Sequence, residues 1–219
     1  VRPGQVITMG HTRVGARAYL AFSGGIDVPL VLGSRSTFRD CELGGLEGDV
    51  LKKGQTLDVF ESDLAPARSV RRDRRPSISS TRVWEVEAVA GPNDDWISPK
   101  SLAQFFSADW TVTAKSARTG YRLSGPAFSY SKKALDKKSD NGSGPTDILD
   151  HGYPIGGVNL SADAPIILLA DGYSFGGLIN PFTIPSAGLW KVGQACPGDK
   201  LRFREVSVET AAALAREID

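Results

Sequence analysis

Three short segments combine glycines with polar side chains, and they are the best candidates in this chain for contact with a small ligand. They are Gly24-Gly25-Ile26-Asp27, Gly156-Gly157-Val158-Asn159 and Asp171-Gly172-Tyr173-Ser174-Phe175-Gly176-Gly177. Glycine has no Cβ, so its backbone can approach a flat ligand closely. A neighbouring carboxylate or carboxamide can then bond the edges of that ligand. Each cluster also suits an ordinary β-turn, so the pattern predicts either a turn or a planar-ligand contact.

Other kinds of catalytic chemistry lack the residue patterns that they require. Asp150 and His151 are adjacent, but no Gly-x-Ser-x-Gly segment supplies a serine nucleophile. No glycine-rich loop has nucleotide-binding spacing, so ATP is not expected to bind to this chain. Cys41, Cys196 and the two histidines lack zinc-ligand spacing, so no metal site is predicted. The acidic pair Asp94-Asp95 precedes a predicted helix, where it suits a turn or cap.

The composition of the 219-residue chain excludes several classes of protein. Lys and Arg number 26 against 25 for Asp and Glu, a net charge of +1 that gives no electrostatic basis for nucleic-acid or membrane binding. The apolar run 164–170 is much shorter than the roughly 20 residues of a membrane-spanning helix. Two cysteines are too few for a disulfide scaffold. We therefore expect a globular protein in a reducing, cytoplasmic setting.

The elements that must position these residues are mostly strands. Short apolar stretches separated by glycines over 5–60 predict short strands and tight turns, so this first segment is expected to be all-β. Alternation over 83–89 predicts a strand that buries Trp84, and 158–160 with 165–169 predict a hairpin. The polar stretch 132–145 predicts a mobile loop. Further strands are expected at 110–114, 121–123 and 200–204, and helices at 98–106, 186–194 and 208–218. Together these elements predict a mainly β fold, in which a β-barrel is accompanied by a few short helices.

Several blocks, taken in order, resemble the KipA family, also called allophanate hydrolase subunit 2 or biotin-dependent carboxyltransferase-like proteins. They cover nearly all of residues 1–206 and comprise Gly15-Ala16-Arg17-Ala18-Tyr19-Leu20-Ala21, Gly24-Gly25-Ile26-Asp27-Val28-Pro29, Leu32-Gly33-Ser34-Arg35-Ser36-Thr37, Gly44-Gly45-Leu46-Glu47-Gly48 and Gly120-Tyr121-Arg122-Leu123. Within this family, Gly152-Tyr153-Pro154-Ile155-Gly156-Gly157-Val158-Asn159 and Leu189-Trp190-Lys191-Val192-Gly193-Gln194 look like the carboxyltransferase domain of urea carboxylase or urea amidolyase.

The resemblance implies cyclophilin-like β-barrel subdomains and an organisation in four parts. Residues 1–67 would end a first subdomain, 68–82 would form an Arg- and Ser-rich linker, 83–206 a second barrel, and 207–219 a C-terminal helix. It also implies transfer of a carboxyl group from carboxybiotin to urea, which yields allophanate. Biotin would be carried on a separate carrier domain, ATP would act only at a biotin carboxylase domain, and a KipI-like half would complete the site. The chain begins at Val1, without an initiator methionine, so we expect a fragment. Because the site would be assembled between two halves, we expect this fragment to be inactive alone.

The resemblance also assigns roles to the glycine clusters. Asn159, Gly157 and Arg122 are the expected substrate contacts. Asn159 is expected to pair edge to edge with urea, because its carboxamide has one acceptor and two donor hydrogens. This role assumes that Asn159 lies on an open bend and not in the interior. Asp171 and Tyr173 are expected to act at the catalytic centre by orienting substrate or biotin, with Arg122 or Arg118 as electrostatic support. Gly176 and Gly177 are the expected biotin contacts.

Two other functions remain open at this point. The chain could be the KipA-type component of a 5-oxoprolinase, which would act on 5-oxoproline and not on urea, although that branch of the family usually differs around Asn159 and Ser174. Alternatively, it is a non-catalytic module that binds a KipI-like protein. Turnover of urea or of 5-oxoproline in a reconstituted system distinguishes these possibilities.

Overall fold

The computed structural model describes residues 4–62, 70–71, 75–78, 80–162 and 164–218 of the chain. It contains two compact units, which we describe separately. One unit comprises Ala18–Ser77, and the other combines Val1–Arg17 with Ile78–Asp219. The second unit contains the regular secondary structure that carries the candidate site.

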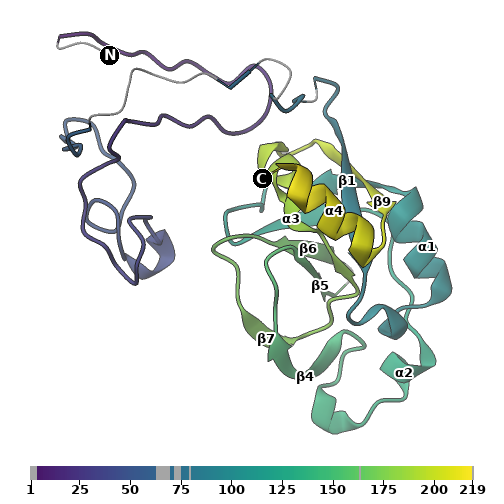
Figure 1. Ribbon diagram of the computed structural model, residues 1–219. Helices are drawn as coiled ribbons and strands as arrows, with labels where there is room; N and C mark the ends of the chain where they lie inside the picture. Colours follow the sequence, from purple (N-terminus) through teal and green to yellow (C-terminus); the bar gives the residue numbers. More distant parts are fainter. Residues whose placement is uncertain (1–3, 63–69, 72–74, 79, 163, 219) are drawn as a thin grey trace. The chain divides into compact units, whose positions relative to one another are not determined.

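Seven strands of the larger unit close into a barrel (Figure 1). The parallel pair β1 and β9 aligns Val83 with Lys200, and the other neighbouring strands are antiparallel. Two further strands, β4 and β7, form a separate ribbon. Around the barrel the order is β1 (Val83–Ala90), β8 (Phe182–Thr183), β5 (Gly157–Ser161), β6 (Ala164–Leu168), β3 (Gly120–Ser124), β2 (Asp109–Val112) and β9 (Lys200–Glu205), and the ribbon pairs β4 (Asp147–Gly152) with β7 (Phe175–Leu178). The predicted β-barrel and the 158–169 hairpin are confirmed.

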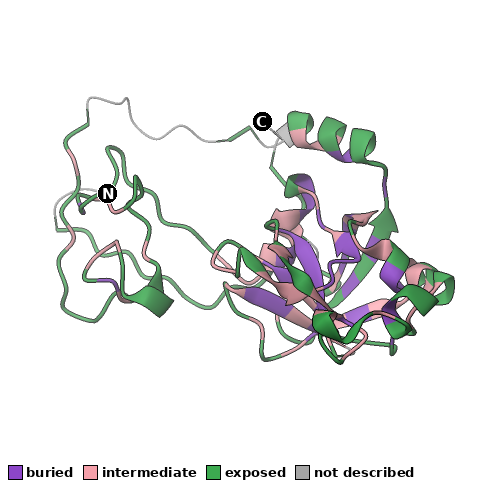
Figure 2. Ribbon diagram, turned by 90° about the horizontal axis from the view of Figure 1, so that it is seen from below, coloured by how far each residue is buried: buried purple, intermediate pink, exposed green. Residues whose placement is uncertain are grey.

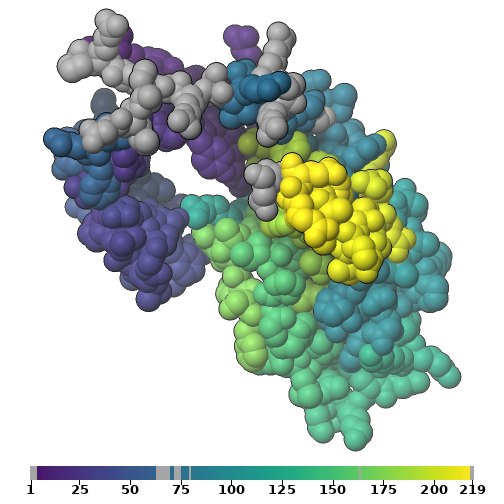
Figure 3. Space-filling view, in the orientation of Figure 1, coloured from purple at the N-terminus to yellow at the C-terminus, as the bar shows by residue number. Residues whose placement is uncertain are grey.

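Short helices surround the barrel, and their ends follow local capping chemistry. They are α1 (Pro99–Ser107), α2 (Lys132–Leu135), α3 (Ser186–Gln194) and α4 (Val208–Ile218), with 3-10 turns η1 (Arg39–Cys41), η3 (Asp94–Trp96) and η4 (Ser139–Asn141). Ser98 Oγ accepts from the Ser101 N–H at 3.2 Å, and Ser207 Oγ accepts from the Thr210 N–H at 3.2 Å. The three predicted helices are therefore confirmed, and α4 lies on the surface of this unit (Figure 3). Among the described helices, none has the length and apolar character to cross a membrane.

Aromatic side chains fill the barrel interior, which is the buried centre in Figure 2. Trp84, Val86 and Ala88 alternate inward from β1, as predicted. The Phe105 ring, carried by α1, stacks on Phe182 at 3.6 Å and on Phe203 at 4.3 Å between ring centroids. Each fully buried aromatic side chain contributes about 1.5–3 kcal/mol to folding. The barrel therefore has a packed core, and a ligand site must lie outside it.

The unit Ala18–Ser77 differs from its prediction. We expected short strands, but its described residues form isolated bridges, such as Ile26 with Val59 and Phe38 with Leu43. Val28 is the buried hydrophobic residue among the described residues of this unit, whereas large apolar side chains such as Leu32 are exposed. Figure 2 shows the described ribbon of this unit mostly in the colour of exposed residues. Strands need a covered apolar face to be stable. The all-β prediction is wrong here, because no second layer covers these side chains within the described part of the unit.

The stretch 132–145 also differs from its prediction. A loop was expected, yet the chain forms α2 and η4 there. Lys137 Nζ donates to the carbonyl oxygens of Asn141 at 3.0 Å, Gly144 at 2.6 Å and Asp147. The polar composition of this stretch is therefore explained in part by Lys137, whose side chain forms hydrogen bonds with backbone carbonyl oxygens.

The start of the chain belongs with the barrel. Gln194 Oε1 accepts from the backbone N–H groups of Ala16 and Arg17, each at 3.1 Å, and Arg17 Nη1 donates to Tyr121 Oη at 2.7 Å. Residues up to 17 therefore join the larger unit, unlike the predicted 1–67 segment. The four-part division stays a prediction. In the 68–82 linker, Arg68, Arg72, Arg74 and Ser79 lie outside the described residues.

Candidate functional site

Arg122 and Asn159, predicted as substrate contacts, lie in one row across three strands. Arg122 of β3 pairs with Ile166 of β6, and Ile166 pairs with Asn159 of β5. Directly paired residues of antiparallel strands share a face of the sheet, and neighbouring strands lie about 4.8 Å apart. The adjacent row of Tyr121, Ile167 and Val158 lies in the barrel core. The Arg122–Asn159 row therefore lies on the outer face of the barrel, with its ends about 10 Å apart by that spacing.

Asn159 does not lie on an open bend. It is a central residue of β5, and its side chain is covered, with 3% of the residue exposed. Its Nδ2 donates to Asn180 Oδ1 at 2.9 Å. No residue in the described part of the chain donates to its Oδ1. The expectation of an open carboxamide is wrong, because Asn180 and Tyr153 cover this part of the strand. One acceptor atom of Asn159 nevertheless remains available to a ligand.

Asn180 is the second amide of this site, and Asn93 holds it in place. Asn93 N–H donates to Asn180 O at 3.1 Å, and Asn180 N–H donates to Asn93 Oδ1 at 2.9 Å. Asn180 is fully buried. Its Nδ2 has no hydrogen-bond partner among the described residues. Buried donors without partners are rare in folded proteins, so this group needs a functional explanation.

Tyr153 closes the other side of the Asn159 carboxamide. Its Oη accepts from the Leu178 N–H at 2.6 Å, which ties it to β7. Burial raises the pKa of the Tyr153 hydroxyl, against smaller lowering effects from hydrogen bonds donated by Leu178 and Asn159. The His151 ring packs edge-on at 5.1 Å. Tyr153 is therefore a neutral hydroxyl near pH 7 that faces the amide pair.

Sequence reasoning did not select Asn93, Tyr153 or Asn180 as site residues. Tyr153 stands inside the Gly152–Asn159 block that carried the resemblance, so that block held a usable signal. Asn180 precedes Pro181, a pattern typical of turns. Asn93 follows Pro92, a pattern that likewise indicates a turn. Asn93, Tyr153 and Asn180 come from segments that are far apart in the chain. They come together only because these segments fold against β5.

The glycines chosen as biotin contacts have their open sides filled by the chain itself. A Cβ at Gly176 would lie 2.8 Å from Tyr153 Oη, and one at Gly177 would lie 2.8 Å from Asp150 Oδ1. A Cβ at Gly157 would lie 3.0 Å from Pro154 O. Glycine is needed at these positions for packing within the chain. The contact of Gly176 and Gly177 with biotin, and that of Gly157 with the substrate, stay predictions.

Asp171 and Tyr173 lie in the loop before β7. Arg118 binds Asp171 through an ion pair, with Nε 2.7 Å from Oδ2, and a hydrogen bond from Nη2 to Oδ1 at 3.1 Å. Tyr173 is 79% exposed. The described hydrogen bonds do not join either residue to the Asn159 cluster. Arg118 therefore neutralises Asp171, and the roles of Asp171 and Tyr173 at the catalytic centre stay predictions.

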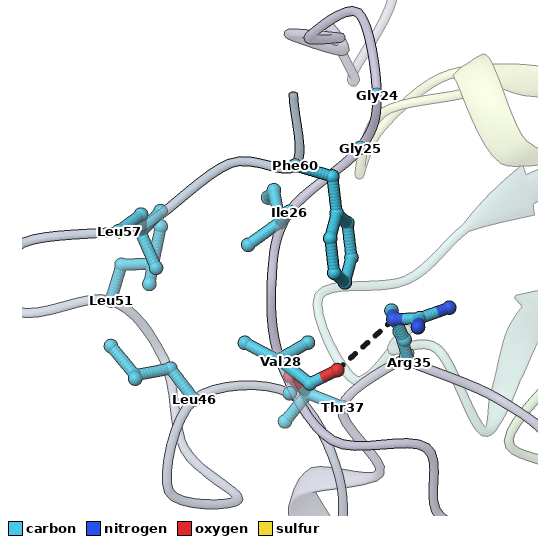
Figure 4. Close-up of a pocket in the computed structure, with 11 residues that line it drawn as sticks. Gly24, Gly25, Ile26, Val28, Arg35, Thr37, Leu46, Leu51, Leu57 and Phe60 are labelled. Atoms are coloured by element: carbon cyan, nitrogen blue, oxygen red, sulfur yellow. Dashed lines mark hydrogen bonds between the residues drawn. The ribbon is translucent and has the colours of Figure 1, made fainter. Parts of the chain in front are cut away.

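A separate cavity of about 710 Å³ lies within the unit Ala18–Ser77 (Figure 4). Its lining is mostly apolar, and its charged residue, Arg35, donates from Nε to Val28 O at 3.0 Å. The lining residues are Gly24, Gly25, Ile26, Val28, Arg35, Thr37, Gly45, Leu46, Leu51, Leu57 and Phe60. Small polar substrates need several convergent polar groups, and this cavity offers few. The amide cluster is therefore the better candidate for a site that binds a small planar amide.

The family model of the carboxyltransferase domain, subdomain A and B, matches residues 1–205. The chain belongs to this family. Among relatives of this carboxyltransferase domain, urea amidolyase of Lachancea kluyveri is 38% identical over 233 residues, and that of Saccharomyces cerevisiae is 36% identical over 226 residues. Each match spans 100% of this chain and 12% of the relative. The chain thus corresponds to a small part of these long proteins.

Two further comparisons place the carboxyltransferase domain among its relatives. The C subunit of Escherichia coli 5-oxoprolinase is 31% identical over 216 residues, which span 96% of this chain and 63% of that protein. The crystal structure of Kluyveromyces lactis urea carboxylase superposes with a TM-score of 0.85 at 34% identity, over 94% of this chain and 19% of the other. The fold is therefore that of the matching region in urea carboxylase.

Proposed function

We propose that this chain forms part of a carboxyltransferase that moves the carboxyl group of carboxybiotin to a nitrogen of urea and so yields allophanate. The observation that carries the proposal is the 36–38% identity to urea amidolyases over the whole chain. Identity to the C subunit of Escherichia coli 5-oxoprolinase is lower, at 31%. The complete reaction is that of a biotin-dependent ligase.

The outer barrel row supports urea as the substrate. Asn159 Oδ1 is a free acceptor for a urea N–H, and Arg122 offers N–H donors for the urea oxygen. Arg122 is half-buried on the same face, and no described side chain pairs with its guanidinium. The positive charge of the Arg122 guanidinium also disfavours binding of a cationic substrate. Together the two side chains would bracket a neutral planar molecule.

Other groups must complete the site. Biotin would supply the carboxyl group when bound, carried on a separate domain, and Gly176 and Gly177 stay its predicted contacts. We therefore assign to this chain the binding and orientation of urea. Asp171 and Tyr173 stay predicted to orient substrate or biotin, with Tyr173 the exposed member. The proposed partners are a KipI-like half, a biotin carrier and a biotin carboxylase that uses ATP, so we expect the isolated chain to be inactive.

A segment exchange tests the substrate. Residues 1–205 would replace the matching segment of Saccharomyces cerevisiae urea amidolyase, and in parallel that of the C subunit of Escherichia coli 5-oxoprolinase. We expect urea-dependent allophanate formation in the first hybrid and no 5-oxoproline turnover in the second. The reverse pattern would make this a 5-oxoprolinase-type protein. Binding to a KipI-like protein without turnover in either hybrid would favour a non-catalytic module.

A further inference from the structure

Three asparagines from separate parts of the barrel unit form a continuous chain of hydrogen bonds. Asn93 follows β1, Asn180 lies between β7 and β8, and Asn159 is inside β5. Two backbone-anchored bonds, at 2.9 and 3.1 Å, fix Asn180 to Asn93. The next bond runs from Asn159 Nδ2 to Asn180 Oδ1 at 2.9 Å. Asn93 thus fixes the backbone of Asn180, from which the side-chain oxygen reaches Asn159.

This arrangement determines which end of the Asn159 carboxamide faces a ligand. Its Nδ2 donates to Asn180 Oδ1 at 2.9 Å, so the nitrogen end of the carboxamide is directed toward Asn180. The oxygen is the remaining end. A free carboxamide rotates readily between its two planar orientations. Held in this way, Asn159 presents an acceptor and not a donor.

In this arrangement the side chain of Asn180 is itself incompletely hydrogen-bonded among the described residues. Its Nδ2 is buried and has no partner within the described residues. A leucine of similar shape would leave no unpaired donor there. The contribution that only a polar side chain makes at this position is the Oδ1 acceptor for Asn159. The residue is therefore better explained by what it does to Asn159 than by its own packing.

We propose that Asn180, anchored by Asn93, is a positioning residue that holds the Asn159 carboxamide with its oxygen toward the substrate. The inference rests on the proposed function, because it takes a substrate that donates an N–H to Asn159. In this proposal Asn180 does not touch the substrate, but it determines which substrate groups can bind to Asn159. A substrate lacking an N–H would be rejected, because it would leave Asn159 Oδ1 unpaired.

The first test follows the Asn159 side chain by NMR in the full 219-residue chain, without any turnover. The probe is hydrogen exchange of the two Asn159 Nδ2 hydrogens. We expect protection in the natural chain, exchange about tenfold faster in Asn180→Ala, and protection retained in Asn180→Asp, which keeps the acceptor. Exchange at the solvent rate in the natural chain would overturn the inference, whatever the enzyme does with urea.

The second test measures urea turnover in the complete enzyme assembled with its partner domains. Asn180→Ala should raise the KM for urea about tenfold with kcat within about twofold, and Asn180→Asp should restore the KM. Ser101→Ala is the matched control, because Ser101 is a buried polar residue of α1 that accepts from the Ser129 N–H at 2.7 Å, outside the site. An unchanged KM in Asn180→Ala, or an equal rise in Ser101→Ala, would overturn the inference. Absence of urea turnover in the natural enzyme would instead refute the proposed function, and the NMR test would still decide the positioning role.

Discussion

Asn159 shows how pairing between strands decides what a side chain can offer. In isolation a carboxamide is both donor and acceptor. Within β5, its donor end is taken by Asn180, and no described residue donates to its acceptor end. Asn159 is 3% exposed, so a ligand reaches it only when a neighbouring side chain moves aside. Under the proposed function, recognition at this position depends on one oxygen atom.

A carboxylate in place of the Asn159 carboxamide should favour a cationic substrate. In Asn159→Asp, rotation of the Asn180 amide would bring its unpaired Nδ2 to the new carboxylate, so the fold should tolerate the change. We expect the ratio of kcat/KM for urea to that for guanidine to fall at least about tenfold. Steady-state kinetics of the complete enzyme measure this ratio, with Asn141→Asp in η4 as a control. An unchanged ratio would contradict the role of Asn159.

The glycine at position 176 should tolerate no side chain. Its Cβ would lie 2.8 Å from Tyr153 Oη and 2.9 Å from Tyr153 Cε2, so Gly176→Ala should destabilise the chain by about 1–3 kcal/mol. The matched control is Gly193→Ala in α3, where a Cβ would meet nothing within 4 Å and alanine favours the helix. Thermal unfolding compares the two variants. Equal stability of both would show that Tyr153 moves aside freely.

At the scale of elements, Asp199 joins the start of β1 to the turn between α3 and β9. Its carboxylate accepts from Arg82 Nε at 2.7 Å, Trp84 Nε1 at 2.9 Å and the Cys196 N–H at 2.9 Å. These groups belong to the start of β1 and to the turn between α3 and β9. The Asp199 side chain is 5% exposed. A buried carboxylate is stable only when such donors replace water, and here they also align β1 with its parallel neighbour.

This carboxylate predicts loss of stability in acid. Burial raises the pKa of Asp199, but its three hydrogen-bond donors outweigh burial, and the net pKa lies below its usual value. The unfolded state therefore binds the proton more readily, so the stabilisation is present above about pH 4 and is lost as the pH falls further. Asp199→Asn should cost about 1–3 kcal/mol at pH 7.

Urea denaturation at several pH values measures this prediction. The stability difference between the natural chain and Asp199→Asn should shrink as the pH falls from about 5 to below about 3. Asp109, whose pKa Arg202 and Lys200 lower to about 2, is present in both proteins and so cancels from the comparison. A difference that stays constant over this range would show that the carboxylate charge is not the source.

At the scale of the whole molecule, the two units differ in how they are stabilised. The barrel unit has a continuous aromatic and aliphatic core. The described part of Ala18–Ser77 has one buried hydrophobic residue, Val28, and a cavity with apolar walls. Apolar surface of this extent is usually covered in a functional assembly. The chain also spans 12% of the urea amidolyases that it matches, which contain much further polypeptide.

Hydrogen exchange should therefore separate the units. Local opening is easiest where few apolar contacts are buried. We expect amides of 18–62 to exchange at least about a hundredfold faster than those of β1, β5 and β9 in the same chain. Mass spectrometry of peptides after timed labelling reports both regions in one sample, so the barrel serves as the internal control. Comparable protection in 18–62 would show that this unit is stable by itself.

Much of the barrel was predictable because its signals are local. Alternation identified β1, and serine caps marked the starts of α1 and α4. The segment 5–60 has similar local signals, yet it forms no regular strands in its described residues, because a strand also needs a partner and a covered face. Local pattern therefore predicted structure correctly only where the chain supplies the second layer itself.

The sequence by itself determined the family and the strand and helix periods, and it singled out Asn159 and Arg122. Only the tertiary structure decided that these two residues share the outer face of the barrel and that Asn180 and Tyr153 cover the carboxamide. It also decided that Gly176 and Gly177 are small to make room for the chain itself. Contacts of this kind join residues far apart in the chain, and their geometry depends on strand register, which local residue preferences do not specify.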